Sequence, residues 1–507
     1  MSDSNLPVQR WLDGSAATVS LAYAAFGAVL TLTFAPFGLY PLAPFCALAV
    51  FMTGLYSTPR RAARHAFFFG IGLFLSGTYW IYVSVHVFGE APLWIAIFLM
   101  LALVLIMAAY LGAVGWLIAR LSDGDPWRLA LVGPAVWTLV EWLRGWVLSG
   151  FPWLSFGYGQ IDSPLSGWAP VIGVYGISWM LLVSAAGAVP LIAGRGSRLA
   201  AVALIVVPWI GGFALQFESW TAPRGQATKV TIVQGGISQD RKWQPDFFMP
   251  TLNLYRNALL EAIDSRLVVW PEVAIPAVTT HVDTYLETLQ RDIRIRGQTL
   301  ALGILEMHPN ERQVYNSVLM LDGDTQQVYR KRHLVPFGEY FPVPDFVREW
   351  MRLLSLPNND MLAGDDEQPL LVAADGTLLA AAICYEDAYG AEQLYALPDA
   401  AVLINVSNDA WFGDSIAPHQ HLQIARMRAL EAGRPVVRAT NNGVSAFIGP
   451  RGELEALAPQ FEFATLTADV QPRSGLTPYA ATGNAPLVAL LAGIVAAMLW
   501  RVRRAAV

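Results

Sequence analysis

The stretch LLAAAICYED at residues 378–387 is an apolar run that ends in a thiol and two carboxylates. An apolar run of this length is typical of a buried strand, and functional side chains in α/β sheets stand where strands end. Its thiol, Cys384, is one of only two cysteines among 507 residues. A lone cysteine after an apolar strand is also commonly a small buried hydrophobe, so it indicates chemistry only together with suitable partners.

Two other expected strand ends supply such partners. Trp270-Pro271-Glu272 follows the apolar run RLVV, and Lys331 lies in YRKRHL after a strand, a turn and QQVY. A carboxylate, an ammonium and a thiol are the parts of an activated-cysteine acyl-transfer site. The chain has only three lysines among 33 basic residues, and a compact ammonium suits a place beside a thiolate and a developing oxyanion. We expect the three strand ends to meet at one edge of a sheet.

Residues 216–484 are typical of an α/β layered domain. Short apolar runs alternate there with turn signals and amphipathic stretches, and charged residues are frequent. The predicted strands are 229–234, 267–270, 299–305, 317–322, 378–383, 401–406 and 443–448, and the predicted helices are 246–265, 282–297 and 418–433.

The rest of the chain has the composition of a membrane protein. Hydrophobic residues make up 55% of the sequence and charged residues 14%, with a mean hydropathy of +0.42. A helical span needs about 20 mostly apolar residues. Apolar stretches of about this length predict about seven spans in a transmembrane domain at 1–215, and a final span with a basic tail at 485–507. The eight predicted spans are 16–34, 39–57, 66–88, 92–118, 129–148, 166–192, 198–215 and 485–500.

The distribution of arginine predicts the topology. Alternate loops hold basic residues such as Arg60, Arg61 and Arg64, whereas the short opposite loops around 35–38, 89–91 and 149–165 hold none. Under the positive-inside rule both termini face the cytoplasm and the catalytic domain lies on the other side. Cys46 falls in a span, so a disulfide with Cys384 is not expected. A net charge of −6, without a basic run outside these loops, predicts no nucleic-acid partner.

The ordered motifs resemble the nitrilase superfamily. The shared segments are ICYED (383–387), KRHLVPFGEY (331–340) and SNDAWFG (407–413). That superfamily has a Glu-Lys-Cys triad in an α-β-β-α sandwich. A domain of this kind before the last of eight spans is similar to the membrane-embedded apolipoprotein N-acyltransferase family, and the likeness covers essentially the whole chain. The resemblance implies Glu272, Lys331 and Cys384 as the triad, with no cofactor and no metal.

The resemblance also implies a reaction in two steps. The Cys384 thiolate would attack the sn-1 ester of a phospholipid, with phosphatidylethanolamine as the expected donor. The α-amine of the diacylglyceryl-cysteine at the N-terminus of an apolipoprotein would then take the acyl chain, in the last step of lipoprotein maturation. Glu272 would act as the base and Lys331 would stabilise the oxyanion. The expected location is the bacterial inner membrane, with a periplasmic catalytic domain.

Further residues match family positions or suggest lipid access. Glu339, Tyr385 and Glu386 match positions that support the triad, and Asn316 and Trp411 match positions near the substrate cleft. Phe346, Trp350, Leu353 and Leu354 have the spacing of an amphipathic helix that would lie on a bilayer, and Trp243 belongs to a second aromatic patch, WQPDFFM. We expect these two segments to be lids, with packing against the domain core as the alternative reading.

Two other functions compete with lipid acyl transfer. One is a membrane-tethered nitrilase-type amidase that hydrolyses a small amide. The other is a transporter or receptor with an inactive nitrilase-like domain, against which the intact triad argues. His419 and His421 do not indicate a metal site, because residues two apart on a helix point to different faces.

Overall fold

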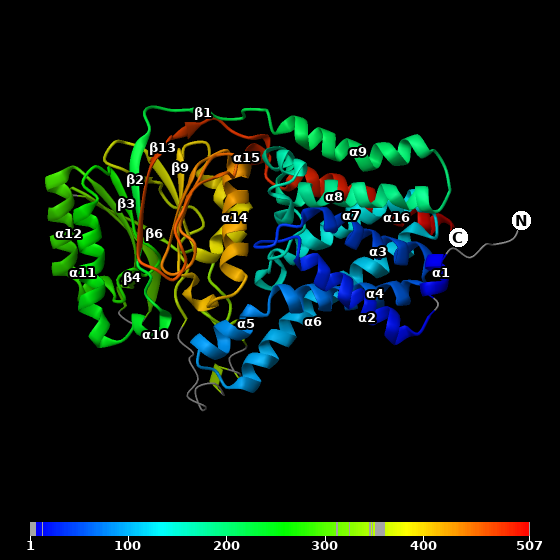
Figure 1. Ribbon diagram of the computed structural model, residues 1–507, viewed down its shortest axis with the longest axis horizontal. Helices are drawn as coiled ribbons and strands as arrows, with labels where there is room; N and C mark the ends of the chain where they lie inside the picture. The colour runs from blue at the N-terminus through cyan, green and yellow to red at the C-terminus, as the bar shows by residue number, and fades with distance from the viewer. Residues whose placement is uncertain are drawn as a thin grey trace, which may run out of the picture. The chain divides into compact units, whose positions relative to one another are not determined.

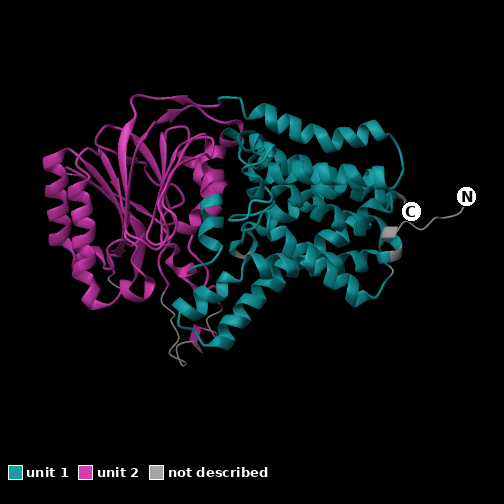
Figure 2. Cartoon of the chain, viewed as in Figure 1, with its two compact units in different colours: residues 1–219, 414–423, 481–507 teal, residues 220–413, 424–480 magenta. Residues whose placement is uncertain are grey.

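The structure is a computed structural model that describes residues 7–12, 14–310, 313–323, 325–343, 346, 348–349 and 360–505. It divides into two compact units, coloured separately in Figure 2. Unit 1 comprises residues 1–219, 414–423 and 481–507, and unit 2 comprises 220–413 and 424–480. Segment 414–423 belongs to unit 1, where Trp153 Nε1 donates to Gln420 Oε1 at 2.7 Å.

Unit 1 is built from helices (Figure 1). They are α1 (Pro7–Leu12), α2 (Ala16–Thr31), α3 (Ala43–Tyr56), α4 (Pro59–Gly77), α5 (Trp80–Tyr82), α6 (Leu93–Ser122), α7 (Pro126–Arg144), α8 (Ala169–Ile192), α9 (Arg198–Leu215) and α16 (Ala485–Ala505). Most are apolar around much of their circumference, which is the pattern of helices that face lipid as well as each other.

Several helices are suited to crossing a membrane. Within the described residues four pass by length and composition, at Leu93–Ser122, Pro164–Ile192, Arg198–Leu215 and Ala485–Arg504. A fifth arises if Pro59–Gly77 and Trp80–Phe88, which are bent by 50°, form one span. Each of the eight predicted spans overlaps a helix, but the count of eight crossings stays a prediction.

Helices α2 and α4 approach each other closely at two glycines. A Cβ on Gly27 would lie 1.9 Å from the Phe69 carbonyl oxygen, and a Cβ on Gly72 would lie 1.8 Å from that of Ala24. Small residues that let backbones touch are a common device of membrane helix pairs. The separation of α2 and α4 therefore depends on glycine at both positions.

Two buried charges in α7 hold the segment that follows it. Glu141 accepts hydrogen bonds from Ser178 Oγ at 2.5 Å and from the Phe156 amide at 3.2 Å. Arg144 donates to the carbonyl oxygens of Phe151, at 2.5 Å, and Trp153, at 2.8 Å. Charged groups stay buried only when partners replace water, so these bonds explain how α7 contains both residues.

Unit 2 contains two six-stranded sheets. The first has the order β13 (Ala464–Val470), β2 (Thr228–Gln234), β3 (Leu267–Val269), β4 (Thr299–Met307), β5 (Val314–Asp322) and β6 (Thr325–Arg330). The second has the order β12 (Leu454–Leu457), β11 (Ala446–Ile448), β10 (Val436–Thr440), β9 (Val402–Ser407), β8 (Leu378–Ile383) and β7 (Leu371–Val372). Strands β2, β3 and β4 are parallel neighbours, as are β8, β9 and β10.

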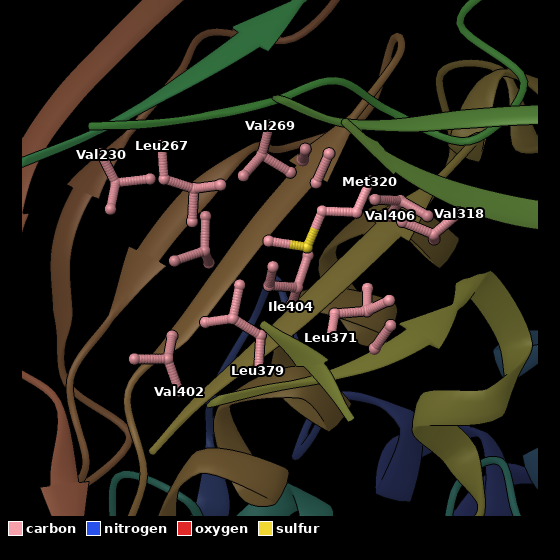
Figure 3. Close-up of a cluster of buried hydrophobic side chains, with 14 of the residues drawn as sticks. Val230, Leu267, Val269, Val318, Met320, Leu371, Leu379, Val402, Ile404 and Val406 are labelled. Atoms are coloured by element: carbon pink, nitrogen blue, oxygen red, sulfur yellow. The ribbon is translucent and has the colours of Figure 1, made fainter. Parts of the chain in front are cut away.

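The apolar faces of the two sheets meet in one core (Figure 3). Val269 and Met320 of the first sheet lie in the same buried cluster as Leu379 and Ile404 of the second. The opposite face of the first sheet packs against α11 (Pro245–Glu261) and α12 (Asp283–Arg296), through residues such as Leu259. Arg428 of helix α14 (Ala417–Ala432) lines a small cavity together with Leu403 and Asn405 of β9. Both faces of the central strands are covered, which explains their unbroken apolar runs.

The predicted strands match the observed ones closely at the site. Strand β8 spans Leu378–Ile383 as predicted, and β2, β3, β4, β5, β9 and β11 overlap their predicted ranges. Strands β6, β7, β10, β12 and β13 of the two sheets were not predicted. In β10 the buried Arg438 interrupts the apolar pattern, and β13 alternates between partly exposed and exposed residues.

The close contact of α2 and α4 makes a testable prediction. Gly27→Ala should destabilise the protein by about 1–3 kcal/mol, because the added methyl group collides with backbone. Thermal unfolding in detergent measures the effect. Gly493→Ala on α16 is the matched control, since a Cβ there meets no atom within 4 Å. Equal unfolding temperatures for the two variants would contradict the close-packing account.

Candidate active site

Glu272 lies at the turn that follows β3. The carboxylate is buried, and its Oε1 accepts a hydrogen bond from Asn316 Nδ2 at 2.7 Å. The same oxygen lies 3.6 Å from Lys331 Nζ. Among the described residues no hydrogen bond to Oε2 of Glu272 is formed. One carboxylate oxygen is therefore fixed in place while the other is available to take a proton.

Lys331 directly follows β6 and is only 1% exposed. Its amide donates to the Asn316 carbonyl oxygen at 2.8 Å, which continues the pairing of β6 with β5. Its ammonium donates to Glu339 Oε1 at 2.8 Å. Burial alone would lower the pKa of Lys331, but the carboxylates of Glu339 and Glu272 outweigh burial and raise it. The ammonium therefore keeps its charge although it is buried.

Cys384 opens the short 3-10 helix Cys384–Ala388 that follows β8. Its φ of +52° lies in the left-handed region, which is uncommon for a residue with a side chain and recurs at functional sites. The two cysteines of the chain, Cys46 and Cys384, are not joined in a disulfide. Burial raises its pKa, the Glu272 carboxylate raises it further, and the Lys331 ammonium opposes them. The resting thiol is therefore protonated and needs a base to become a nucleophile.

Asn316 and Glu339 complete the cluster. Asn316, on β5, donates through Nδ2 both to Glu272 and to Glu339 Oε1, the latter at 3.1 Å. The other oxygen of Glu339 accepts from the Val335 amide at 2.8 Å. One amide and one ammonium thus bridge two buried carboxylates. The structure brings both residues to the triad, although the sequence itself supplied no independent argument for Asn316.

Glu386 joins the cysteine turn to the segment after β6. Its carboxylate accepts from the amides of Ile383, at 2.6 Å, and Arg332, at 2.7 Å, and from the Tyr329 hydroxyl at 3.0 Å. These bonds fix the backbone beside Cys384 to the backbone beside Lys331. Tyr385 is packed among rings, with its centroid 5.2 Å from that of Tyr389.

A second ionic network near the cysteine was not predicted from the sequence. The fully buried Arg438 of β10 lies 3.3 Å from Asp387 Oδ2 and 3.0 Å from Asp409 Oδ2. Asp409 also accepts from Ser407 Oγ at 2.9 Å, and Ser407 is hydrogen-bonded to Cys384. The acidic residues in ICYED and SNDAWFG were the available signal, but nothing in the sequence paired them with Arg438, which follows Asp387 by 51 residues and Asp409 by 29.

The described residues predicted for the lids, Trp243 and Phe346, and the predicted cleft residue Trp411 have exposed side chains. Trp243 is 52% exposed, Phe346 74% and Trp411 40%. Trp350 and Leu354 lie outside the described residues. Across the described part of the chain, no group of three or more His, Cys, Asp or Glu side chains is placed to hold a metal ion.

This arrangement has the chemistry of covalent acyl transfer. It combines the partly buried, protonated thiol of Cys384 with the buried carboxylate of Glu272, one oxygen of which is free, and the buried ammonium of Lys331. An ammonium held in low dielectric is a strong stabiliser of an oxyanion, because no water screens it.

Two family models match the chain. A model described as apolipoprotein N-acyltransferase N-terminal domain matches residues 26–187, and one described as carbon-nitrogen hydrolase matches residues 229–479. Among solved structures, a mutant of the Nesterenkonia AN1 amidase from the nitrilase superfamily aligns with a TM-score of 0.39 and 20% identity. That alignment covers 52% of this chain and 97% of the amidase.

Curated relatives match over nearly their full length. The apolipoprotein N-acyltransferase of Methylococcus capsulatus is 42% identical over 482 residues, which covers 94% of this chain and 95% of the relative. The protein of the same name from Vibrio cholerae is 39% identical over 503 residues, covering 96% and 97%. With this identity over this length, and with both family models matched in order, the chain belongs to the apolipoprotein N-acyltransferase family.

Proposed function

We propose that the protein transfers a fatty acyl chain from the sn-1 position of a phospholipid to the α-amine of an apolipoprotein. The acceptor is the N-terminal diacylglyceryl-cysteine, and the acyl chain passes through a thioester on Cys384. The observation that carries the proposal is the buried cluster of a protonated thiol, a half-free carboxylate and an ammonium held between two carboxylates. Membership of the family supplies the class of donor and acceptor.

The first step acylates the cysteine. The free oxygen of Glu272 takes the thiol proton, and the sulfur of Cys384 attacks the ester carbonyl carbon of the lipid. The carbonyl oxygen becomes an oxyanion, which Lys331 stabilises. When this intermediate collapses, the carbon–oxygen bond to glycerol breaks. The lysophospholipid leaves with the proton that Glu272 returns, so that a thioester remains.

The second step transfers the acyl chain to nitrogen. Glu272 removes a proton from the α-ammonium of the acceptor, and the neutral amine attacks the thioester carbon. Lys331 again stabilises the oxyanion. Collapse then breaks the carbon–sulfur bond. The leaving sulfur takes the proton that Glu272 holds, and the nitrogen gives its second proton to solvent, so that an amide and the thiol of Cys384 remain. Dividing an ester-to-amide transfer into two easier displacements is the general advantage of covalent catalysis.

Burial suits this sequence of proton transfers. Because burial raises the pKa of Cys384, the thiol is not ionised until a base and a substrate act on it. Because the pKa of Lys331 is also raised, its charge persists throughout the cycle. The supporting roles that we propose for Asn316, Glu339 and Glu386 are to hold these groups in register.

We further propose the membrane arrangement that the arginine distribution favours. Eight spans, seven within 1–215 and one within 485–507, would place both termini in the cytoplasm of a bacterium. The catalytic segment 216–484 would then lie on the periplasmic face of the inner membrane, where lipid donor and lipoprotein acceptor meet it. The exposed aromatic side chains of Trp243, Phe346 and Trp411, with Trp350 and Leu354, would guide acyl chains to the site.

Incubation with phospholipid alone tests the first step. The protein mixed with phosphatidylethanolamine micelles should gain one acyl mass on Cys384, measured by intact-mass and peptide mass spectrometry. Cys384→Ala should gain none, since the sulfur is the acceptor. Release of free fatty acid at a rate that leaves no thioester would instead favour an amidase-like hydrolase, the competing function.

The bridge between Lys331 and Glu339 makes a second prediction. Glu339→Gln should slow acylation about 10- to 100-fold, because the ammonium loses its shortest ionic partner and the site loses its alignment. Glu306→Gln is the matched control. Glu306 Oε1 lies 2.7 Å from Nη2 of Arg330, the residue before Lys331, and this ion pair is not part of the cluster. A Glu339 variant as fast as the Glu306 variant would contradict the role of this bridge.

A further inference from the structure

A second lysine is buried against the turn that carries Glu272. Lys242 ends the short helix α10 (Gln239–Lys242) and is 3% exposed. Its Nζ donates to the main-chain carbonyl oxygen of Glu272 at 3.2 Å. In the described ranges this is the one hydrogen bond that the ammonium makes, although an ammonium has three protons to donate. A buried charge with a single polar partner needs an explanation.

The use of lysine at this position is unusual for this chain. Only Lys229, Lys242 and Lys331 are lysine among 33 basic residues, and two of these three are buried beside Glu272. Lysine presents a compact charge that fits a narrow place and can lose its proton when buried. Arginine is wider and keeps its charge.

The bond of Lys242 falls on a strained stretch of backbone. Val273, the residue after Glu272, has a φ of +46°, which a β-branched residue rarely adopts. From the side of β4, the Gly303 amide donates to the Pro271 carbonyl at 3.2 Å, and the Ala274 amide donates to the Gly303 carbonyl at 2.9 Å. Lys242 donates to the Glu272 carbonyl oxygen, which lies between these two bonds along the chain. The conformation that presents the Glu272 carboxylate is thus fixed from two sides.

Charge supports the same role. Lys331, with Glu339 beside it, faces Glu272 from the end of β6, and Cys384 faces it from the end of β8. Lys242 faces it from α10. Burial lowers the pKa of Lys242 to about 8, which the Glu272 carboxylate only partly offsets. The pKa values of Lys331 and Cys384 are both raised. Of these two groups and Lys242, it is therefore Lys242 that loses its proton near pH 8.

We propose that Lys242 is a positioning residue whose ammonium fixes the Glu272 turn and keeps the Glu272 carboxylate in place to take the Cys384 proton. This inference rests on the proposed acyl transfer, in which Glu272 is the base. It adds to the triad a residue that acts through Glu272 and does not touch the substrate. Lys242 also links the base to α10, and the exposed Trp243 directly follows that helix.

Acyl-enzyme formation without an acceptor isolates this role. Phosphatidylethanolamine micelles are mixed with the full-length protein, and the rate constant of Cys384 acylation is followed by mass spectrometry at several lipid concentrations. Lys242→Met should lower the maximal rate constant about 10- to 100-fold without changing the lipid concentration for half-maximal rate. Lys242→Arg should restore most of the rate. Lys229→Met, on β2, is the matched control and should acylate like the wild type.

The pH dependence of the same rate separates charge from packing. In the wild type the rate constant should fall as pH rises through about 8, because Lys242 loses its charge there. Lys242→Arg should show no fall in that range, since a guanidinium stays protonated. No lipopeptide acceptor is present, and the ethanolamine ammonium of the lipid is common to both assays, so a difference between the two pH profiles comes from residue 242.

Each outcome decides the matter. Wild-type rates in Lys242→Met, or the same fall near pH 8 in Lys242→Arg, would overturn the positioning role while leaving the proposed acyl transfer intact. If Lys242→Met proves unfolded by thermal unfolding in detergent, the pH profile of Lys242→Arg still decides. If the wild-type protein forms no thioester with the lipid, the proposed function fails and this inference fails with it.

Discussion

The ammonium of Lys331, buried between two carboxylates, is the interaction on which the site depends. A buried charge is costly unless its partners replace water, and here Glu339 lies 2.8 Å and Glu272 3.6 Å from the nitrogen. Removing either carboxylate would leave the buried ammonium with a single ionic partner. The same pairing fixes one oxygen of Glu272 and leaves the other free. Structural neutralisation and the presentation of a base are thus achieved by one set of bonds.

The two sheets explain how residues more than 100 positions apart in the chain come together. Glu272 follows β3 and Cys384 follows β8, each a strand with parallel neighbours, so that functional side chains collect at strand ends. Lys331 arrives differently, at the end of the antiparallel strand β6. The apolar core between the sheets, shown in Figure 3, sets their separation and therefore the distances within the site. Glu386 then ties the cysteine turn to the segment after β6.

Much of this arrangement was predictable because its signals are local. Apolar runs that end in Glu272 and Cys384, and a lysine in an arginine-rich chain, indicated both the strands and the cluster. Other features depend on contacts that no local pattern records. Arg438 interrupts the apolar pattern of its strand. Its charge is tolerated there because Asp387 and Asp409, which lie far from it in sequence, neutralise it. Lys242 is as rare a residue type as Lys331, but its partner is a backbone carbonyl, which every residue possesses, so no sequence pattern identified the contact.

The central claim is that the thioester on Cys384 is an intermediate whose acyl group goes to an amine. A single-turnover chase tests this claim most directly. Protein acylated with phospholipid is freed of excess lipid and mixed with a diacylglyceryl lipopeptide, and both species are followed by mass spectrometry. The account predicts that the acyl mass leaves Cys384 at the rate at which it appears on the α-amine of the peptide. Loss of the acyl group to water as free fatty acid, with the peptide amine unmodified, would contradict it.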